Sequence, residues 1–472
     1  MSPPTTQLAI LGTGPGGYTA AFLAADLGMK VTLIDRHATP GGTCLHYGCI
    51  PSKALLHISR ILSESREAAQ FGIRFPEPQI DLDRVRCWKN EVVQKLADGL
   101  ADLCKRRGIE RIVGQARFVD SHTVRTELSQ GGEDLLAFEH IILATGSVSA
   151  NIPGLALNSP PIWTSTEGLE LQTIPQSLLV VGGGFIGLEL STVYASLGTR
   201  VSVVEMTDSL LPGVDRDLVR VLSGRMGLMF EKVMLNALVV GVDIGHIGPI
   251  IRIQHKDGTI SEDQYEKVLL CTGRKPNTRD LDLQNTSVEL DSRGFVKVDT
   301  QQRTTDPAIL AIGDLTGGPM LAHKAAHEGH IAAEALAGNQ TVSKAETIPA
   351  VVFTDPEIAW CGLTETEARQ AGRNVTVTRF PWGASGRAVT LGRTDGLTKI
   401  IIDPETQRIL GMGIVGYGAG ELIAEGALAI RMGATAADLE SVVHPHPTLS
   451  ETLMESAALF SGRCIHLYRP KK

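Results

Sequence analysis

One arrangement occurs twice in the chain: an apolar segment, a glycine-rich turn, a helix of small residues and a second apolar segment ending in an acid. The first copy is QLAILGTGPGGYTAAFLAADLGMKVTLID, which ends at Asp35, and the second is SLLVVGGGFIGLELSTVYASLGTRVSVVE, which ends at Glu205. Each acid stands 23 positions after the first glycine of its turn. A single G-x-G-x-x-G match is weak, but two matches with the same flanking elements and the same offset predict two dinucleotide-binding units.

The three glycines of each turn have separate physical roles. The first allows a tight turn, the second lets the backbone approach a pyrophosphate, and the third permits close packing of helix on strand, with the helix N-terminus facing the phosphates. These glycines are Gly12, Gly14 and Gly17 in the first unit and Gly182, Gly184 and Gly187 in the second. The alternative is a pair of tight turns that bind nothing.

The two acids indicate which nucleotides the units bind. We expect Asp35 and Glu205 to accept hydrogen bonds from adenosine ribose hydroxyls. A carboxylate at Glu205 would repel a 2′-phosphate, so the second unit should prefer NAD(H) to NADP(H).

Composition excludes several classes of protein. The chain has 472 residues and a formal net charge of -8, and it contains no basic tract, so nucleic acid and anionic membranes are poor partners. No apolar run reaches the ~18 residues of a spanning helix, and the N-terminal stretch has no secretory signal. Seven cysteines, thinly spread, form no secreted disulfide framework. We expect a soluble, cytoplasmic protein.

The stretch GGTCLHYGCIPSKALLH contains two cysteines, Cys44 and Cys49, just before an expected helix. Pro51 fits the first turn of that helix. A thiolate at Cys49 would lie near the helix N-terminus, where the dipole and free N–H groups lower its pKa. Two other interpretations remain at this point: a zinc half-site that includes His46, and two structural thiols. The other five cysteines are expected to be buried free thiols, and no metal site is expected.

Motifs along nearly the whole chain resemble those of the flavoprotein disulfide reductases. They are, in order, GTGPGGYTAA, GGTCLHYGCIPSK, ATGS, GGGFIGLE, TGRKPN, AIGD, LAHKA and HPHPTLSE. CIPSK and HPTLSE are most similar to the dihydrolipoamide dehydrogenase branch. That branch implies oxidation of protein-bound dihydrolipoyl groups with reduction of NAD+, through FAD and a redox disulfide, in a homodimer.

The resemblance also implies an α/β fold with two Rossmann-like units, for FAD and NAD, and a C-terminal α+β dimerisation domain. We expect the FAD unit to span residues 1–148 and 274–345, the NAD unit residues 149–273 and the dimerisation domain residues 346–472. The sequence pattern supports the last boundary, because segments of alternating polar and apolar residues typical of strands, such as TVTRF and LTKIIID, begin after about Glu346.

The resemblance assigns a role to each catalytic residue. Cys44 and Cys49 are the redox pair, with Cys49 against the flavin and Cys44 exchanging with substrate. His446 is the acid/base and Glu451 holds its other ring nitrogen, whereas His444 is taken as structural. In relatives the His446 segment reaches into the partner subunit's active site. Lys53 and Glu189 pair beside the flavin, where hydride passes to nicotinamide.

Further cofactor residues follow from the same motifs. For FAD, besides the first glycine turn, Asp35 and Lys53, they are Gly42, Thr43, Gly114, Thr145, Gly146, Asp314, Leu321, Ala322 and His323. For NAD, besides the second turn and Glu205, they are Ile186 and Gly273.

The chain departs from the branch between its two cysteines. His46 and Tyr47 replace the usual Asn and small aliphatic residue, which is either neutral variation or a change in disulfide potential or lipoyl fit. The implied partner is a lipoyl-bearing carrier: a subunit of a 2-oxo acid dehydrogenase complex, a glycine cleavage carrier, or a lipoate-binding protein of sulfur oxidation.

Three rival functions are opposed by particular residues. Mercuric reductase needs a C-terminal cysteine pair, but the C-terminus has only Cys464. Glutathione-type reductases prefer NADPH, which Glu205 opposes. A silent flavoprotein subunit would have lost a cysteine, the histidine or the lysine, and all are present.

Overall fold

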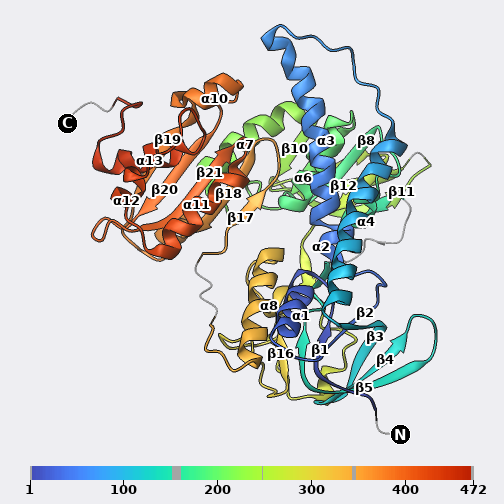
Figure 1. The fold of residues 1–472 in the computed structure, drawn as a ribbon. Helices are drawn as coiled ribbons and strands as arrows, with labels where there is room; N and C mark the ends of the chain where they lie inside the picture. Colours follow the sequence, from blue (N-terminus) through green and yellow to red (C-terminus); the bar gives the residue numbers. More distant parts are fainter. Residues whose placement is uncertain (1–2, 151–160, 247, 343–346, 469–472) are drawn as a thin grey trace.

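The computed structural model describes residues 3–150, 161–246, 248–342 and 347–468. It has three units, each built on its own sheet (Figure 1). The expected fold class is confirmed. The expected domain boundaries stay predictions, and the one at 345/346 falls on residues outside the described ranges.

The first unit surrounds a sheet with a parallel centre. β1 pairs with β2 on one side and with β5 on the other, and β16, about 165 positions further along the chain, extends the sheet beyond β5. The long strands β3 and β5 also pair with β4 as an antiparallel meander. The strands are β1 (Thr5–Leu11), β2 (Val31–Asp35), β3 (Glu110–Asp120), β4 (Thr123–Leu128), β5 (Glu133–Leu143) and β16 (Ile309–Ala311).

Helices of the first unit pack on one face of this sheet, whereas strands β3 to β5 cover the other face. α1 packs on α8 through alanines, while α3 and α4 form a long pair that reaches the second unit (Figure 1). The helices are α1 (Pro15–Asp26), α2 (Gly42–Tyr47), α3 (Cys49–Glu67), α4 (Leu82–Arg106) and α8 (Ala322–Leu336).

The second unit has the same architecture as the first. Its parallel sheet has the order β10-β9-β8-β14-β7, and a three-stranded antiparallel sheet, β11-β12-β13, lies beside it. Its strands are β7 (Ile162–Trp163), β8 (Ser177–Val181), β9 (Arg200–Glu205), β10 (Lys232–Leu235), β11 (Leu238–Ile244), β12 (Pro249–Gln254), β13 (Ile260–Gln264) and β14 (Lys267–Leu270). Its helices are α5 (Ser165–Glu170), α6 (Phe185–Ser196) and α7 (Arg216–Met229).

A two-stranded antiparallel ribbon connects the first two units. It pairs β6 (Ser147–Ser149), where the chain leaves the first unit, with β15 (Arg274–Pro276), where it returns. The second unit is therefore inserted between two parts of the first.

The C-terminal unit is an antiparallel sheet in the order β17-β18-β21-β20-β19 with helices on it. Its strands are β17 (Ala350–Val352), β18 (Glu357–Gly362), β19 (Thr376–Pro381), β20 (Leu397–Ile402) and β21 (Ile409–Gly416). Its helices are α9 (Glu365–Gln370), α10 (Gly386–Leu391), α11 (Ala419–Met432), α12 (Ala436–Ser441) and α13 (Glu451–Ser461).

The two glycine turns are repeated in detail. Gly12 and Gly182 have φ of +103° and +112°, a region that L side chains rarely adopt. A Cβ on Gly12 would lie 2.3 Å from Ala144 O, and one on Gly182 would lie 2.4 Å from Cys271 O. The tight turns predicted from the sequence are therefore required by close backbone contacts with the ends of the neighbouring strands β5 and β14.

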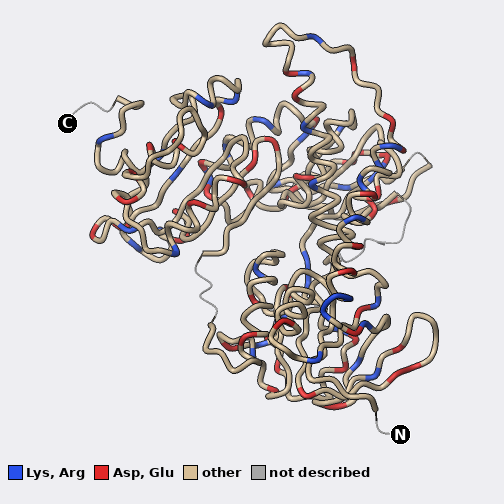
Figure 2. Tube along the Cα trace, viewed as in Figure 1, with Lys and Arg blue, Asp and Glu red and all other residues tan. Residues whose placement is uncertain are grey.

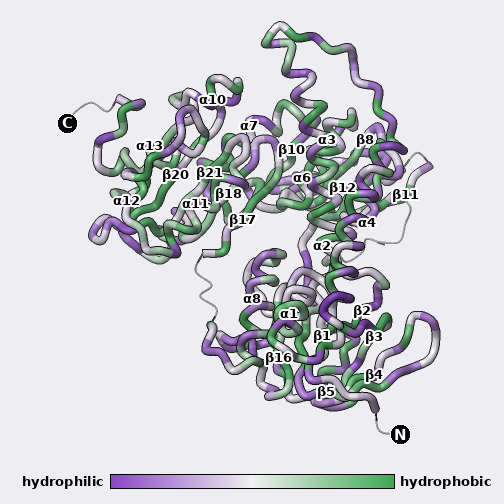
Figure 3. The backbone as a smooth tube through the Cα atoms, viewed as in Figure 1, coloured by the Kyte–Doolittle hydropathy of each residue, from purple (hydrophilic) through white to green (hydrophobic). Residues whose placement is uncertain are grey.

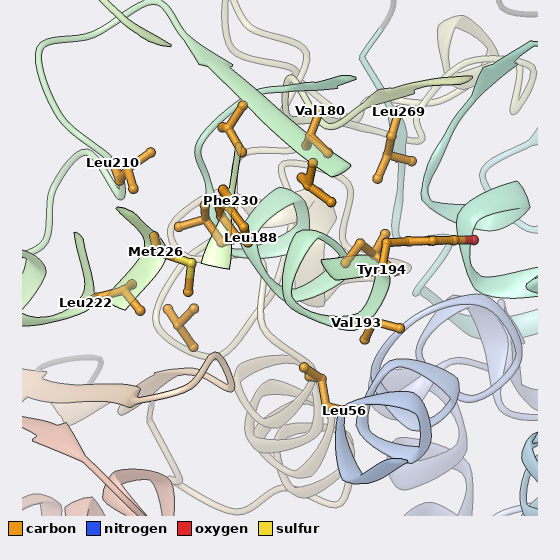
Figure 4. Close-up of a cluster of buried hydrophobic side chains, with 14 of the residues drawn as sticks. Leu56, Val180, Leu188, Val193, Tyr194, Leu210, Leu222, Met226, Phe230 and Leu269 are labelled. Atoms are coloured by element: carbon orange, nitrogen blue, oxygen red, sulfur yellow. The ribbon is translucent and has the colours of Figure 1, made fainter. Parts of the chain in front are cut away.

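The apolar residues follow the strands and the inner helix faces (Figure 3). One core cluster joins the first two units, because Leu56 of α3 packs with Leu188, Val193 and Tyr194 of α6 (Figure 4). Acidic and basic residues are interspersed along the whole trace (Figure 2). No helix among the described residues is long and apolar enough to cross a bilayer.

Candidate active site

A cavity of about 330 Å³ runs through the first unit to the boundary with the second. One end is lined by Asp35 and Gly114, and the other by Cys49, Lys53 and Glu189. Such a volume lies within the range of small-molecule sites.

Most residues predicted to bind FAD line this cavity: Gly12, Gly14, Asp35, Gly42, Thr43, Lys53, Gly114, Thr145, Gly146, Asp314 and Ala322. Among the described residues, the lining does not include Gly17, Leu321 or His323. A Cβ on Gly17 would lie 1.9 Å from Gly12 O, so Gly17 serves helix–strand contact, as the sequence predicts. Leu321 is the N-cap of α8, and His323 Nε2 lies 2.6 Å from Pro349 O.

The lining fits FAD where Gly42 approaches Gly14. A Cβ on Gly42 would lie 2.6 Å from Gly14 Cα, so two glycine backbones meet at the start of α1. Pro15 occupies the first turn of α1, whose free N–H groups face the cavity. Backbone donors at a helix N-terminus with no side chain in the way are the usual setting for a pyrophosphate. The residues present would therefore hold FAD.

The two cysteines lie on successive helices in the cavity wall. Cys44 is in α2 and Cys49 is the first residue of α3, with Gly48 between the helices. Their side chains hydrogen-bond to each other. The hydrogen bond from Cys44 and the charge of Lys53 lower the pKa of Cys49 to about 7, while the same hydrogen bond raises the pKa of Cys44. Cys49 is thus the thiol that ionises first.

Lys53 and Glu189 join the two nucleotide-binding units beside the dithiol. Lys53 Nζ donates to both carboxylate oxygens of Glu189, at 2.9 and 3.1 Å. Glu189 is buried and also accepts a bond from the N–H of Phe353 at 3.0 Å. Lys53 Nζ lies 4.5 Å from the Phe353 ring centroid. All three units therefore meet at this ion pair.

The acids at the strand ends brace their own glycine turns. Asp35 Oδ2 accepts bonds from Thr13 N–H and hydroxyl, both at 2.8 Å. Glu205 Oε2 accepts from Gly183 N–H at 2.7 Å, and its Oε1 accepts from Thr207 N–H and hydroxyl at 2.8 Å. Asp35 lines the cavity, whereas the lining among the described residues does not include the buried Glu205.

The residues predicted for NAD lie on the other side of the boundary. Within the described ranges, the cavity lining does not include Gly182, Gly184, Gly187 or Gly273, and Ile186 alone of this set belongs to it. Gly273 has φ +111° and accepts a backbone bond from Ala150 at the base of the β6–β15 ribbon. Ile186 therefore lies between the two predicted nucleotide sites.

The histidine dyad predicted from the sequence is formed. His446 Nδ1 lies 2.9 Å from Glu451 Oε1, and Glu451 Oε2 accepts from Thr448 N–H at 2.7 Å. Burial would raise the pKa of Glu451, but the Thr448 and His446 hydrogen bonds outweigh it and lower that pKa. The His446 side chain is 73% exposed.

Within one chain the dyad and the dithiol are far apart. Figure 1 shows α13, which begins at Glu451, on the far side of the C-terminal unit from α2. The dyad and the dithiol of one chain therefore do not form a single site. His444 has a different setting: its side chain is 3% exposed and its Nε2 lies 2.9 Å from Glu425.

Sequence reasoning missed Ser147 and Arg274, which line the cavity. Arg274 Nε and Nη2 donate to the hydroxyl and carbonyl oxygens of Ser147, each at 2.6 Å, and the Ser147 hydroxyl donates to the Asp314 carboxylate. Both residues follow the Thr-Gly pair that ends each strand-then-TG pattern, ATGS and CTGR. The polar residue that follows the Thr-Gly pair in both patterns could have indicated that Ser147 and Arg274 belong to the site.

His46 and Tyr47, which replace the residues usual between the two cysteines, have different surroundings. His46 is not a lining residue of the cavity, and its Nε2 lies 3.1 Å from Pro40 O. Tyr47 lines the cavity, and its ring centroid lies 5.8 Å from that of His37, another lining residue. Tyr47 therefore belongs to the wall near the Asp35 end rather than to a separate substrate channel.

The carboxylate cluster Asp215, Asp217 and Glu365 is the arrangement closest to a metal site among the described residues. Lys399 Nζ occupies its centre, 2.8 to 2.9 Å from all three carboxylates. Lys399 is fully buried between the second and C-terminal units.

Comparison with known proteins agrees with this geometry. The model of pyridine nucleotide-disulphide oxidoreductases matches residues 6–329, and that of their dimerisation domain matches residues 348–457. Dihydrolipoyl dehydrogenase of Vibrio cholerae is 43% identical over 98% of both chains. That of Haloferax volcanii is 44% identical over 98% of this chain and 97% of its own.

Solved structures give the same result. LpdA of Mycobacterium tuberculosis has a TM-score of 0.89 at 28% identity, over 96% of this chain and 99% of that one. The Cu(II) complex of the HOCl-induced flavoprotein disulfide reductase RclA of Escherichia coli has a TM-score of 0.86 at 28% identity, over 97% and 100%. The chain therefore belongs to the pyridine nucleotide-disulphide oxidoreductase family, together with the dihydrolipoyl dehydrogenases.

Proposed function

We propose that this chain is an NAD-dependent dihydrolipoyl dehydrogenase that oxidises protein-bound dihydrolipoyl groups. The observation that carries the proposal is the position of the dithiol, because Cys44 and Cys49 line the cavity at the start of α3 beside the Lys53–Glu189 pair, and the Cys44 hydrogen bond and the charge of Lys53 lower the pKa of Cys49. A thiolate at neutral pH is the species that takes part in disulfide exchange, and a cation beside it favours that charge state.

The chain's residues supply the thiol chemistry. In the disulfide form, a dihydrolipoyl thiolate attacks Cys44 Sγ, which breaks the Cys44–Cys49 bond and releases Cys49 as a thiolate. The second lipoyl sulfur then displaces Cys44 and leaves oxidised lipoyl. Bound FAD supplies two-electron transfer between the dithiol and nicotinamide. Lys53 stabilises the Cys49 thiolate, since its charge lowers the pKa of Cys49.

The proton of the substrate thiol goes to His446 of a second chain. His446 is exposed and lies far from the dithiol of its own chain, while Glu451 holds its Nδ1 and leaves Nε2 to face substrate. The matched dimerisation domain supports a homodimer. We infer that each catalytic centre contains the dithiol of one protomer and the histidine of its partner.

NAD should bind at the second glycine turn. Glu205 is followed by Met206 and Asp208 rather than by a basic residue, so no cation there would neutralise a 2′-phosphate. The nicotinamide would reach the cavity past Ile186, which lines it at the unit boundary.

The substrate is a lipoyl group on a separate carrier, and the reaction is expected in the cytoplasm. A carrier of a 2-oxo acid dehydrogenase complex, a glycine cleavage carrier and a lipoate-binding protein of sulfur oxidation would all present the same dithiol arm.

A coupled assay tests the proposal. The purified yellow protein is mixed with free dihydrolipoamide and NAD+, with NADP+ in a parallel reaction, and NADH formation is followed at 340 nm. We expect rapid turnover with NAD+ only. A protein whose flavin is reduced by NADH but that never oxidises dihydrolipoamide would contradict the assigned substrate and direct the search to other disulfides.

A further inference from the structure

A buried ion pair lies directly behind the cavity wall. Lys324 and Glu328, one turn apart on α8, are 6% and 7% exposed, and Lys324 Nζ lies 2.8 Å from Glu328 Oε1. The neighbouring α8 residues Ala322 and Ala325 line the cavity. The LAHKA motif includes Lys324, yet its resemblance assigned roles only to the three residues before it.

The pair holds both backbone polar groups of one residue. Glu328 Oε2 accepts the Gly313 N–H at 2.7 Å, and Lys324 Nζ donates to Gly313 O at 3.1 Å and to the Thr316 hydroxyl at 3.2 Å. Gly313 has φ +77°, and a Cβ there would lie 3.0 Å from Ala325 Cβ. The turn η3 (Gly313–Thr316) is thus fixed to α8 by two charges.

Asp314, the residue after Gly313, connects this fixed turn to the cavity. Asp314 follows Gly313, lines the cavity and accepts the Ser147 hydroxyl bond, while Arg274 holds Ser147. Lys324 and Glu328 themselves are not among the described residues that line the cavity. They act on a bound cofactor only through the turn and through their electric field.

We propose that Lys324 and Glu328 are positioning residues that orient Asp314 toward FAD and, as a compensated pair of charges, set the flavin potential. The inference rests on the proposed FAD site. Because the pair is neutral as a whole and buried, removing either partner leaves one weakly screened charge beside the cavity.

The sign of that charge makes the test specific. Lys324→Met leaves a carboxylate, which disfavours adding electrons and should lower the flavin potential. Glu328→Gln leaves an ammonium and should raise it, while its amide oxygen can still accept the Gly313 N–H. Local unfolding would move both variants in the same direction. The double variant is neutral and should return toward the wild-type potential.

The experiment measures the flavin potential of each holoenzyme at pH 8 by equilibration with a reference dye. We expect each single variant to change the ratio of reduced to oxidised flavin at a fixed potential by about tenfold, which is about 30 mV for a two-electron couple. FAD affinity of the apoproteins, from fluorescence titration, gives a second readout. Lys324→Arg keeps the charge and should restore both quantities.

Lys399→Met provides a matched control, because Lys399 is also a buried lysine held by carboxylates but lies between the other two units. It should lower stability and leave the flavin potential unchanged. Equal potentials in all variants, or shifts of the same sign in both single variants, would overturn the inference. A wild-type protein that binds no flavin would instead refute the proposed function.

Discussion

Lys53 of α3 reaches Glu189 of α6, 136 positions later in the chain, and donates to both of its carboxylate oxygens. The contact brings a charge from each nucleotide-binding unit together within the wall of one cavity. It also fixes the dithiol at the start of α3 relative to the second unit. The proposed route of electrons from the dithiol to nicotinamide therefore crosses the contact between the two units that this ion pair stabilises.

The two cysteines should be distinguishable by titration. Ultraviolet thiolate absorbance of the reduced protein should show an ionisation near pH 7, because the pKa of Cys49 is about 7. Cys44→Ser should keep this transition, since the serine hydroxyl still donates, whereas Cys49→Ser should lose it. Both variants should bind flavin and lose dihydrolipoamide turnover. The opposite titration result would exchange the roles of the two thiols.

Removing the histidine should separate the two half-reactions. His446→Gln is expected to slow oxidation of dihydrolipoamide by about 10²- to 10⁴-fold, because general acid–base catalysis contributes that much. Flavin reduction by NADH should change little. His444→Gln is the matched control, since His444 bonds Glu425 and should affect mainly stability. Stopped-flow absorbance measures each half-reaction, and equal slowing of both would refute the thiol-side role of His446.

Changing the acid of the second unit should relax nucleotide selectivity. In Glu205→Ala the carboxylate that would repel a 2′-phosphate is lost, and so are its bonds to Gly183 and Thr207. We expect the ratio of kcat/KM for NADPH to that for NADH to rise at least tenfold, equivalent to about 1.4 kcal/mol. Met206→Ala, at an exposed neighbour, should leave the ratio unchanged. An unaltered ratio in Glu205→Ala would remove Glu205 from nucleotide selection.

The lysine among three carboxylates should give the protein a characteristic acid sensitivity. Burial would raise the pKa values of Asp215 and Asp217, but other contacts outweigh it and lower both: Lys399 at each carboxylate, backbone N–H groups at Asp215 and Arg379 at Asp217. Carboxylates with lowered pKa stabilise the fold above their unfolded pKa of about 3.9, and this stability is lost as the pH falls through the folded values. The midpoint of thermal unfolding should therefore fall steeply below about pH 4.

Lys399→Met tests the same cluster by removing the lysine instead of protonating the carboxylates. Breaking a buried pair costs about 3–5 kcal/mol, so the melting temperature at pH 7 should drop by several degrees. The difference from wild type should shrink as the pH falls, because protonation relieves the repulsion among the three carboxylates left behind. Lys232→Met, which breaks a half-exposed pair with Asp263, should cost under about 1 kcal/mol. A pH-independent difference would show that packing, not charge, dominates at Lys399.

Tyr47 should affect cofactor binding rather than substrate. Its ring packs near His37 in the cavity wall, and burial lowers the pKa of His37. Tyr47→Val should weaken FAD binding by about two- to tenfold, the value of an aromatic contact. His46→Asn, outside the lining, serves as the control. A changed KM for dihydrolipoamide with unchanged FAD affinity would support the alternative effect on lipoyl fit.

The sequence predicted the parts of this molecule that repeat or lie close together in the chain. Both glycine turns, the start of α3 at Cys49 and the His446–Glu451 contact follow from local spacing and known motifs. Contacts between distant segments were predicted only where a motif named both partners, as for Lys53 and Glu189.

Other long-range contacts carry no local pattern. Ser147 and Asp314 are 167 positions apart, and Lys399 lies 182 positions from Asp217. Their pairing depends on how the inserted unit and the C-terminal unit pack against the first unit. Hydrophobic periodicity along the sequence does not predict that packing. The position of the dyad far from its own dithiol is likewise a property of the assembled units.

The order of strands in the first sheet has a consequence for synthesis on the ribosome. β16 pairs with β5, and α8 packs on α1, yet both follow the whole of the inserted second unit in the chain. In the nascent chain, the β5 edge and the alanine-rich face of α1 therefore stay uncovered while the second unit, complete at β14, can already fold. The part of the cavity wall that Asp314, Ala322 and Ala325 supply is synthesised after that unit, so the FAD site is complete only once α8 has emerged.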